Sequence, residues 1–197
     1  IAFGCTIVLK PSEEASLTTL RLGELILEAG FPEGAVNIVT GYGHEAGQAL
    51  VDHPLVRKIA FTGSTATGQK ILESSARQMK RVTLELGGKS PAIVLADADL
   101  NKAIPGAANA IFPNSGQVCT AGSRLFVEAS IYDEVTRGVA EIARNLRLGS
   151  GFDAVNELGP LISARQLERV SSLVSSGVEE GAQPLCGAGR AAGKGYF

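Results

Sequence analysis

Short β-branched apolar runs that alternate with helix-like segments most restrict the fold of this chain. Four such runs occupy residues 5–10, 36–39, 57–61 and 81–86, and each is typical of a strand. The segments between them carry apolar residues near helical spacing, as residues 17–29 do with six leucine, isoleucine and alanine positions. Strands that alternate with helices indicate βαβ units with right-handed crossovers. The sequence therefore predicts an α/β fold with a parallel sheet and helices on both of its faces.

The expected elements continue along the whole chain. Ser12 is expected to cap a first helix that runs to Gly30, and Ser64 to open a third one. Further predictions are a helix at 45–51, strands at 91–96 and 124–128, helices at 100–112, 132–146 and 164–180, and a late strand at 183–187. The pair Gly87-Gly88 indicates a crossing between domains, so we expect a first domain at 1–87 and a second at 88–197. Both ends are typical of the interior of elements, which predicts an internal piece of a longer protein.

Composition excludes several kinds of partner. The formal net charge of −2 gives no general attraction to nucleic acid or to anionic membranes, and no apolar run has the length of a membrane span. The three cysteines, Cys5, Cys119 and Cys186, lie far apart, and the chain has only two histidines. We therefore expect no disulfide framework, no metal site, and a reducing, cytoplasmic location.

Several polar or glycine positions fall where the predicted strands end. In open parallel sheets, ligands bind beyond the carboxyl ends of the strands. Residues 63–68, Gly-Ser-Thr-Ala-Thr-Gly, follow the third strand, although no Gly-x-Gly-x-x-Gly follows the first. The glycine would let backbone approach a phosphate, and the Ser64 hydroxyl with the first free helix N–H groups could bind an anion. The same residues equally suit an ordinary helix N-cap.

Cys119 lies in a polar, glycine-rich segment at 113–123, between an apolar stretch and the strand-like residues 125–127. A thiol on such a turn has little apolar cover and can be approached by a substrate, which suits a nucleophile. The alternative is a small buried apolar side chain.

Three segments, at 59–68, 82–91 and 112–124, resemble the aldehyde dehydrogenase superfamily in their content and order. The resemblance covers residues 4–197. It implies a Rossmann-like NAD-binding domain followed by part of a second, thiol-bearing α/β catalytic domain. By resemblance, residues 63–68 bind the pyrophosphate of NAD(P), and Lys10 and Glu13 meet the adenosine ribose. A carboxylate at Glu13 suits ribose hydroxyls and repels a 2′-phosphate, so we expect NAD and regard NADP as less favoured. The cofactor-binding positions implied in this way are Lys10, Glu13, Gly43, Gly63, Ser64, Thr65, Gly68, Leu86 and Gly87.

The resemblance also implies a reaction, the oxidation of an aldehyde to a carboxylic acid. Cys119 would attack as a thiolate and pass through a thiohemiacetal and a thioester, with its backbone N–H as one oxyanion donor. Glu85 would be the general base that activates water, and partial desolvation at the end of an apolar strand would strengthen it. The alternative for Glu85 is a carboxylate that only accepts backbone hydrogen bonds.

The expected partners are a small aldehyde and further copies of the chain, in a dimer or a tetramer. A second hypothesis is a non-catalytic nucleotide-binding or structural remnant that keeps the fold without turnover. A CoA-acylating relative is a third, and Glu85 argues against it because a hydrolytic base has little use there.

Overall fold

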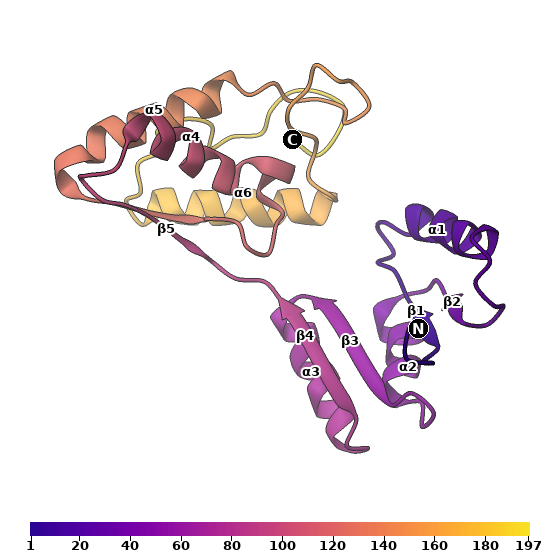
Figure 1. The fold of residues 1–197 in the computed structure, drawn as a ribbon. Helices are drawn as coiled ribbons and strands as arrows, with labels where there is room; N and C mark the ends of the chain where they lie inside the picture. Colours follow the sequence, from indigo (N-terminus) through magenta and orange to yellow (C-terminus); the bar gives the residue numbers. More distant parts are fainter. The chain divides into compact units, whose positions relative to one another are not determined.

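Three βαβ units follow one another along the chain, and each is a pair of parallel strands joined through a helix (Figure 1). The computed structural model describes residues 1–197. The strand pairs are β1 (Ile7–Leu9) with β2 (Val36–Ile38), β3 (Lys58–Gly63) with β4 (Arg81–Leu86), and β5 (Pro91–Val94) with β6 (Arg124–Val127). The joining helices are α1 (Leu17–Glu28), α3 (Thr65–Ala76) and α4 (Leu100–Ile111). The predicted parallel α/β class is confirmed.

The chain divides into two compact units, Ile1–Leu86 and Gly87–Phe197. The first holds β1 to β4, and the second holds β5, β6 and the remaining helices. Whether these units act as a cofactor-binding and a catalytic domain stays a prediction.

In the first unit, a small apolar core lies between α2 (Gln48–Asp52), β3 and α3. Its buried members are Val51, Ile59 and Ile71. A π-helical turn, Gly43–Gly47, leads into α2, so the predicted helix at 45–51 begins earlier and ends one residue later. Along β4 the side chains alternate between half-buried Val82, Leu84 and Leu86 and exposed neighbours. That period of two fixes which face of the strand meets α3.

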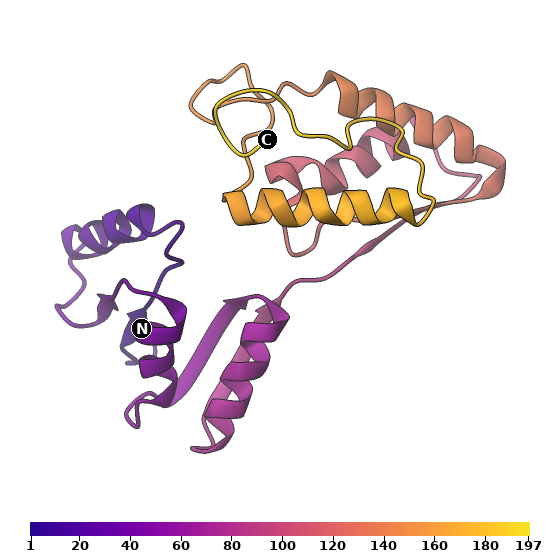
Figure 2. The ribbon, with the colours of Figure 1, turned by 180° about the vertical axis from the view of Figure 1, so that it is seen from behind.

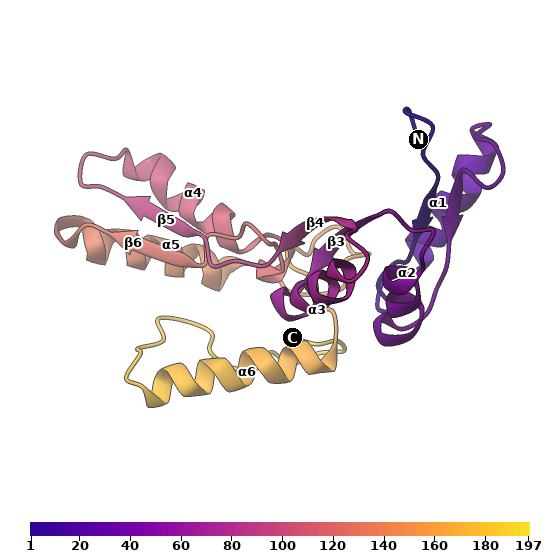
Figure 3. The same cartoon turned by 90° about the horizontal axis from the view of Figure 1, so that it is seen from below.

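In the second unit, small side chains let α4 pack closely on α5 (Tyr132–Asn145), and Figure 3 shows these helices beside β5 and β6. Val135 of α5 is fully buried, and Ala107 and Ala108 of α4 are buried as well. A long helix, α6 (Ala164–Glu179), follows a loop and is seen along its length in Figure 2. Ser163 caps α6 by accepting a hydrogen bond from the Gln166 N–H.

Three local predictions are wrong. The first helix begins at Leu17 and not at Ser12, because the Ser12 hydroxyl accepts the Glu14 N–H at 3.3 Å and holds a turn instead. The apolar run at residues 5–10 predicts a buried strand, but each residue of β1 is exposed, and α1 packs on β2. The late strand at 183–187 does not form. Pro184 has no N–H to donate to a neighbouring strand, and the Leu185 carbonyl accepts a hydrogen bond from the Arg144 guanidinium at 2.8 Å.

None of the helices has both the length and the apolar character that crossing a bilayer requires.

Candidate active site

Cys119 is a free, exposed cysteine on the loop that leads from α4 into β6. The exit of this loop is fixed by two backbone hydrogen bonds, from the Gly122 N–H to the Ala110 carbonyl at 2.8 Å and from the Arg124 N–H to the Ser90 carbonyl at 3.3 Å. Ser90 directly precedes β5, and Arg124 begins β6. Cys119 therefore lies toward the amino ends of this strand pair. The rule that sites lie at carboxyl ends would not have found it.

The backbone before Cys119 is left-handed over three consecutive residues. Asn114, Ser115 and Gly116 have φ angles of 53°, 55° and 72°. The turn closes on itself, because the Gln117 N–H and side-chain amide both donate to the Asn114 carbonyl, at 3.0 and 3.1 Å. In return, the Asn114 amide donates to the Gln117 carbonyl at 3.1 Å. These hydrogen bonds close the loop in a conformation that local sequence preference alone would not favour.

Two further bonds tie the loop to the segment before α6. The Ser115 hydroxyl donates to the Gly159 carbonyl at 2.7 Å, and the Gln117 side-chain oxygen accepts the Ile162 N–H at 3.0 Å. Sequence reasoning missed both residues. The partners lie more than forty residues away along the chain, so no local pattern could have indicated them.

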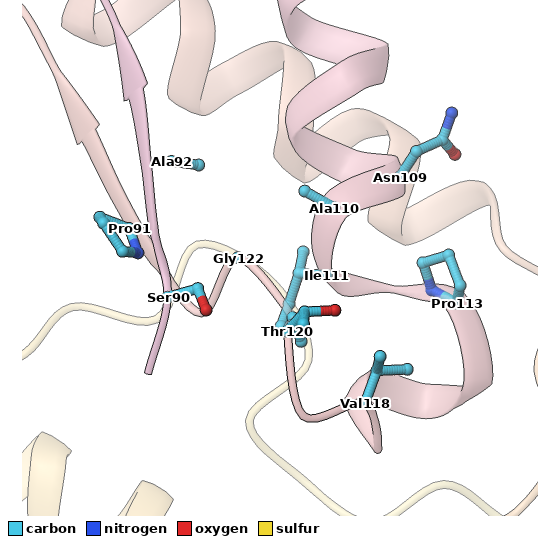
Figure 4. Close-up of a pocket in the computed structure, with 11 residues that line it drawn as sticks. Ser90, Pro91, Ala92, Asn109, Ala110, Ile111, Pro113, Val118, Thr120 and Gly122 are labelled. Atoms are coloured by element: carbon cyan, nitrogen blue, oxygen red, sulfur yellow. The ribbon is translucent and has the colours of Figure 1, made fainter. Parts of the chain in front are cut away.

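A hollow of about 340 Å³ lies next to the Cys119 loop. Figure 4 shows its lining side chains, which come from the start of β5, the end of α4 and the loop itself. Val118 and Thr120, on either side of Cys119, line it, but Cys119 does not. The thiol therefore does not open into this hollow.

Glu85 lies on β4, paired in register with Thr62 of β3, one residue before the Gly63–Leu86 pair. Glu85 therefore lies near the end of β4, within the first unit. Its side chain is exposed, so the expected partial desolvation is wrong for this chain. The reason is the strand alternation, which turns Leu84 and Leu86 toward α3 and Glu85 to the opposite face.

Residues 63–68 form the end of β3 and the start of α3. Ser64 is the N-cap: its hydroxyl accepts the Thr67 N–H at 3.2 Å and lies 2.9 Å from the Thr67 hydroxyl. The capping alternative is therefore realised. The first N–H groups of any helix have no acceptor inside the helix, and here they include the N–H of Thr65. The N-terminal end of α3 can therefore still bind an anion.

Gly68 and Leu86 are placed for packing. A Cβ at Gly68 would lie 2.9 Å from the Leu86 Cδ2, so this glycine permits the close approach of α3 to β4. Gly87, just after β4, is exposed, and a Cβ there would meet nothing within 4 Å. This glycine leaves open space beside the end of β4.

Lys10, at the end of β1, is largely buried, with 15% of its side chain exposed. Its ammonium donates to the Pro11 carbonyl at 2.6 Å and to the Gly41 carbonyl at 3.1 Å, and lies 3.7 Å from the Glu13 carboxylate. Lys10 thus joins the loops that follow β1 and β2. Between these loops is a hollow of about 160 Å³, lined by Pro11, Ser12, Glu13, Ser16, Thr40, Gly41 and Tyr42.

This arrangement fits a nucleotide by the chemistry of its groups. The Glu13 carboxylate at the hollow can accept hydrogen bonds from sugar hydroxyls, and the start of α3 suits a phosphate. Gly43 opens the π-helical turn directly after Tyr42, which lines the same hollow. No group of three histidine, cysteine or acidic side chains is arranged to hold a metal ion.

The structure is that of a parallel α/β protein with a free thiol on a hydrogen-bonded loop and a small hollow beside the ends of β1 and β2. The sequence model of the aldehyde dehydrogenase family matches residues 1–197, and the chain belongs to that family.

Similar proteins carry more specific names. The chain is 52% identical over 198 residues to a phenylacetaldehyde dehydrogenase of Pseudomonas fluorescens, covering 100% of this chain and 39% of that protein. It is 51% identical over 195 residues to retinal dehydrogenase 2 of Homo sapiens, covering 98% and 38%. The chain thus spans about two fifths of the length of these curated relatives.

A solved structure is similar over the whole chain. The complex of an aldehyde dehydrogenase from Bacillus cereus with NAD⁺ superposes with a TM-score of 0.98 at 52% identity, covering 100% of this chain and 40% of the other. The fold is therefore that of the corresponding part of an aldehyde dehydrogenase.

Proposed function

We propose that this chain supplies the NAD-binding and nucleophile-bearing parts of an enzyme that oxidises an aldehyde to a carboxylic acid. The observation that carries the proposal is the free, exposed Cys119 on a hydrogen-bonded loop, in a chain that matches the aldehyde dehydrogenase family over its whole length. The NAD⁺ complex of the similar Bacillus cereus enzyme supports NAD as the cofactor. The substrate class is an aldehyde because the relatives are named for aldehydes.

Residues of the first unit would hold NAD. The Glu13 carboxylate at the small hollow would accept hydrogen bonds from the adenosine ribose hydroxyls, and Lys10 would keep the two flanking loops together. The pyrophosphate would lie at the start of α3, near Gly63, Ser64 and Thr65. A 2′-phosphate would meet the negative charge of Glu13, so NAD is favoured over NADP. Gly43, Gly68, Leu86 and Gly87 are assigned by family resemblance, with Gly68 and Leu86 acting through packing.

The chemistry proposed for Cys119 begins with attack of its thiolate on the aldehyde carbon. A C–S bond forms, the carbonyl π-bond opens, and the oxygen of the resulting thiohemiacetal would receive the Cys119 backbone N–H. When bound, NAD supplies the acceptor for the hydride that leaves this carbon. Cys119 then holds the acyl group as a thioester.

Glu85 would complete the reaction as general base. Its carboxylate takes a proton from water, the water oxygen bonds to the thioester carbon, and the C–S bond breaks to release the acid and the Cys119 thiolate. Exposure of Glu85 leaves it free to accept this proton.

The proposal also covers the cellular compartment and the oligomeric state of the protein. Three free cysteines without a disulfide suit a reducing, cytoplasmic compartment. The family resemblance suggests a homo-oligomer, either a dimer or a tetramer.

The test is NADH formation at saturating NAD with short, aromatic and betaine-type aldehydes. Cys119→Ser should abolish turnover, and Cys186→Ser, which removes a half-buried thiol from the same unit, should keep it. Glu85→Gln should give a burst of one NADH for each active site, followed by slow release of the acid. Turnover that survives Cys119→Ser would refute the nucleophile assignment. NAD-protected alkylation of Cys119 without any turnover would favour the non-catalytic remnant.

A further inference from the structure

We propose that Ser115 and Gln117 are positioning residues, which hold Cys119 in its reactive place by tying its loop to residues 159–162. The inference rests on the proposed function, because it concerns the same reaction. Neither side chain is required to touch substrate or cofactor. Both would act through the position of Cys119.

The backbone of the loop gives the first reason. Glycine adopts a left-handed conformation without strain and asparagine tolerates it, but serine rarely does. Ser115 nevertheless has a φ of 55°, directly between left-handed Asn114 and Gly116. A residue persists in such a conformation only where its surroundings over-determine it.

The Ser115 hydroxyl supplies part of that determination. It donates to the Gly159 carbonyl at 2.7 Å in a partly buried setting. The left-handed backbone and this bond occur at the same residue. The strain at Ser115 is therefore coupled to the tether.

Gln117 holds the loop from two sides. Its Nε2 donates to the Asn114 carbonyl within the loop, at 3.1 Å, and its Oε1 accepts the Ile162 N–H at 3.0 Å. One planar amide thus joins the turn before Cys119 to a segment far along the chain. Cys119 follows only two residues later.

The anchor at residues 159–162 is itself fixed. The Leu161 N–H donates to the Tyr196 carbonyl at 2.9 Å, and Ser163 caps α6 immediately afterwards. A tether to this segment therefore restrains the loop instead of moving with it.

Cys119 lies between this tether and a second fixed point. Downstream, the Gly122 N–H donates to the Ala110 carbonyl of α4 at 2.8 Å. Upstream, Ser115 and Gln117 make the long-range bonds. Displacement of a reacting group by about 1 Å can cost about 100-fold in rate, so loss of the upstream bonds should be measurable in turnover.

The experiment uses the purified protein with Ser115→Gly and Gln117→Met, alone and combined. Ser115→Gly removes the hydroxyl and the left-handed strain together, so its thermal midpoint should stay close to that of the wild type. Gln117→Met keeps a similar length and loses both amide bonds. Thr136→Val is the matched control, because it removes a side-chain to backbone hydrogen bond inside α5, away from the loop.

We expect kcat for aldehyde oxidation to fall about 10- to 100-fold in both loop variants. KM for NAD should stay within about twofold, because the proposed NAD contacts do not involve the loop. The amide proton of Ile162, followed by NMR, should exchange at least about tenfold faster in Gln117→Met and at the wild-type rate in Thr136→Val.

The results test two statements separately: that the hydrogen bonds tether the loop, and that the tether supports catalysis. Unchanged kcat in both loop variants of an active enzyme overturns the positioning role, and unchanged exchange at Ile162 overturns the tether. A fall in kcat that follows the thermal midpoint, and that Thr136→Val reproduces, reduces the two residues to a structural role and overturns the inference. If the wild-type protein makes no NADH, the proposed function fails and the catalytic part of this inference fails with it, while Ile162 exchange still reports the tether.

Discussion

Gly122 is the position where one added methyl group should disturb the Cys119 loop most directly. An alanine Cβ there would lie 3.0 Å from the Ala110 Cβ, 3.5 Å from the Ala92 Cβ and 3.6 Å from the Ala110 carbonyl oxygen. Each of these neighbours is backbone or attached directly to it, so none can move by a side-chain rotation. The loop must shift away from α4, and the 2.8 Å bond from the Gly122 N–H to Ala110 must lengthen.

Two opposing effects set the expected change in the free energy of unfolding. Overpacking of a tight contact costs typically about 1–3 kcal/mol. Replacing glycine by alanine also restricts the unfolded chain, which stabilises by about 0.4–1 kcal/mol at compatible sites. We therefore expect Gly122→Ala to lower the free energy of unfolding by about 1–2 kcal/mol.

Gly106 gives the matched control. It lies on the exposed face of α4, and a Cβ there would meet nothing within 4 Å. Gly106→Ala should raise the free energy of unfolding by roughly 0.5–1 kcal/mol, through helix propensity. The assay is chemical denaturation followed by far-ultraviolet circular dichroism, with all three proteins side by side. If both substitutions change stability in the same direction, the argument from close approach at Gly122 is refuted.

Three further predictions concern single side chains. Ser64→Ala should lower stability by about 1 kcal/mol in thermal unfolding, because it removes the N-cap of α3, whereas Ser64→Gly should cost only a few tenths; equal losses would contradict the capping role. Val135→Ala removes two methyl groups from a fully buried site and should cost about 2–3 kcal/mol in urea unfolding, and a loss below about 0.5 kcal/mol would mean that the site is not packed. Hydrogen bonds from Ser74 and Gln48 hold the pKa of Asp52 below its ordinary range. The stability that they add is present above the unfolded pKa of about 3.9 and is lost as pH falls through the lower folded pKa. An acid titration of the unfolding free energy should show this loss in the wild type and not in Asp52→Asn.

The local sequence already determined the order and the type of most elements. The β-branched runs became parallel strands, and β4 has the predicted bounds because its apolar and polar residues alternate without interruption. Asp99 and Ser163 cap helices close to where the apolar periodicity begins. Such features depend on backbone preference and on neighbours a few residues away, so they can be predicted directly from the local sequence.

Only the tertiary structure decided which side chains these elements bring together. Ser12 holds a turn instead of capping a helix, and Glu85 is exposed because Leu84 and Leu86 occupy the face of β4 that meets α3. The tether from Gln117 to Ile162 joins residues separated by more than forty positions. Bonds of that kind depend on how distant segments fold back on one another. For this reason the sequence could single out Cys119, while the side chains that hold its loop emerged only in three dimensions.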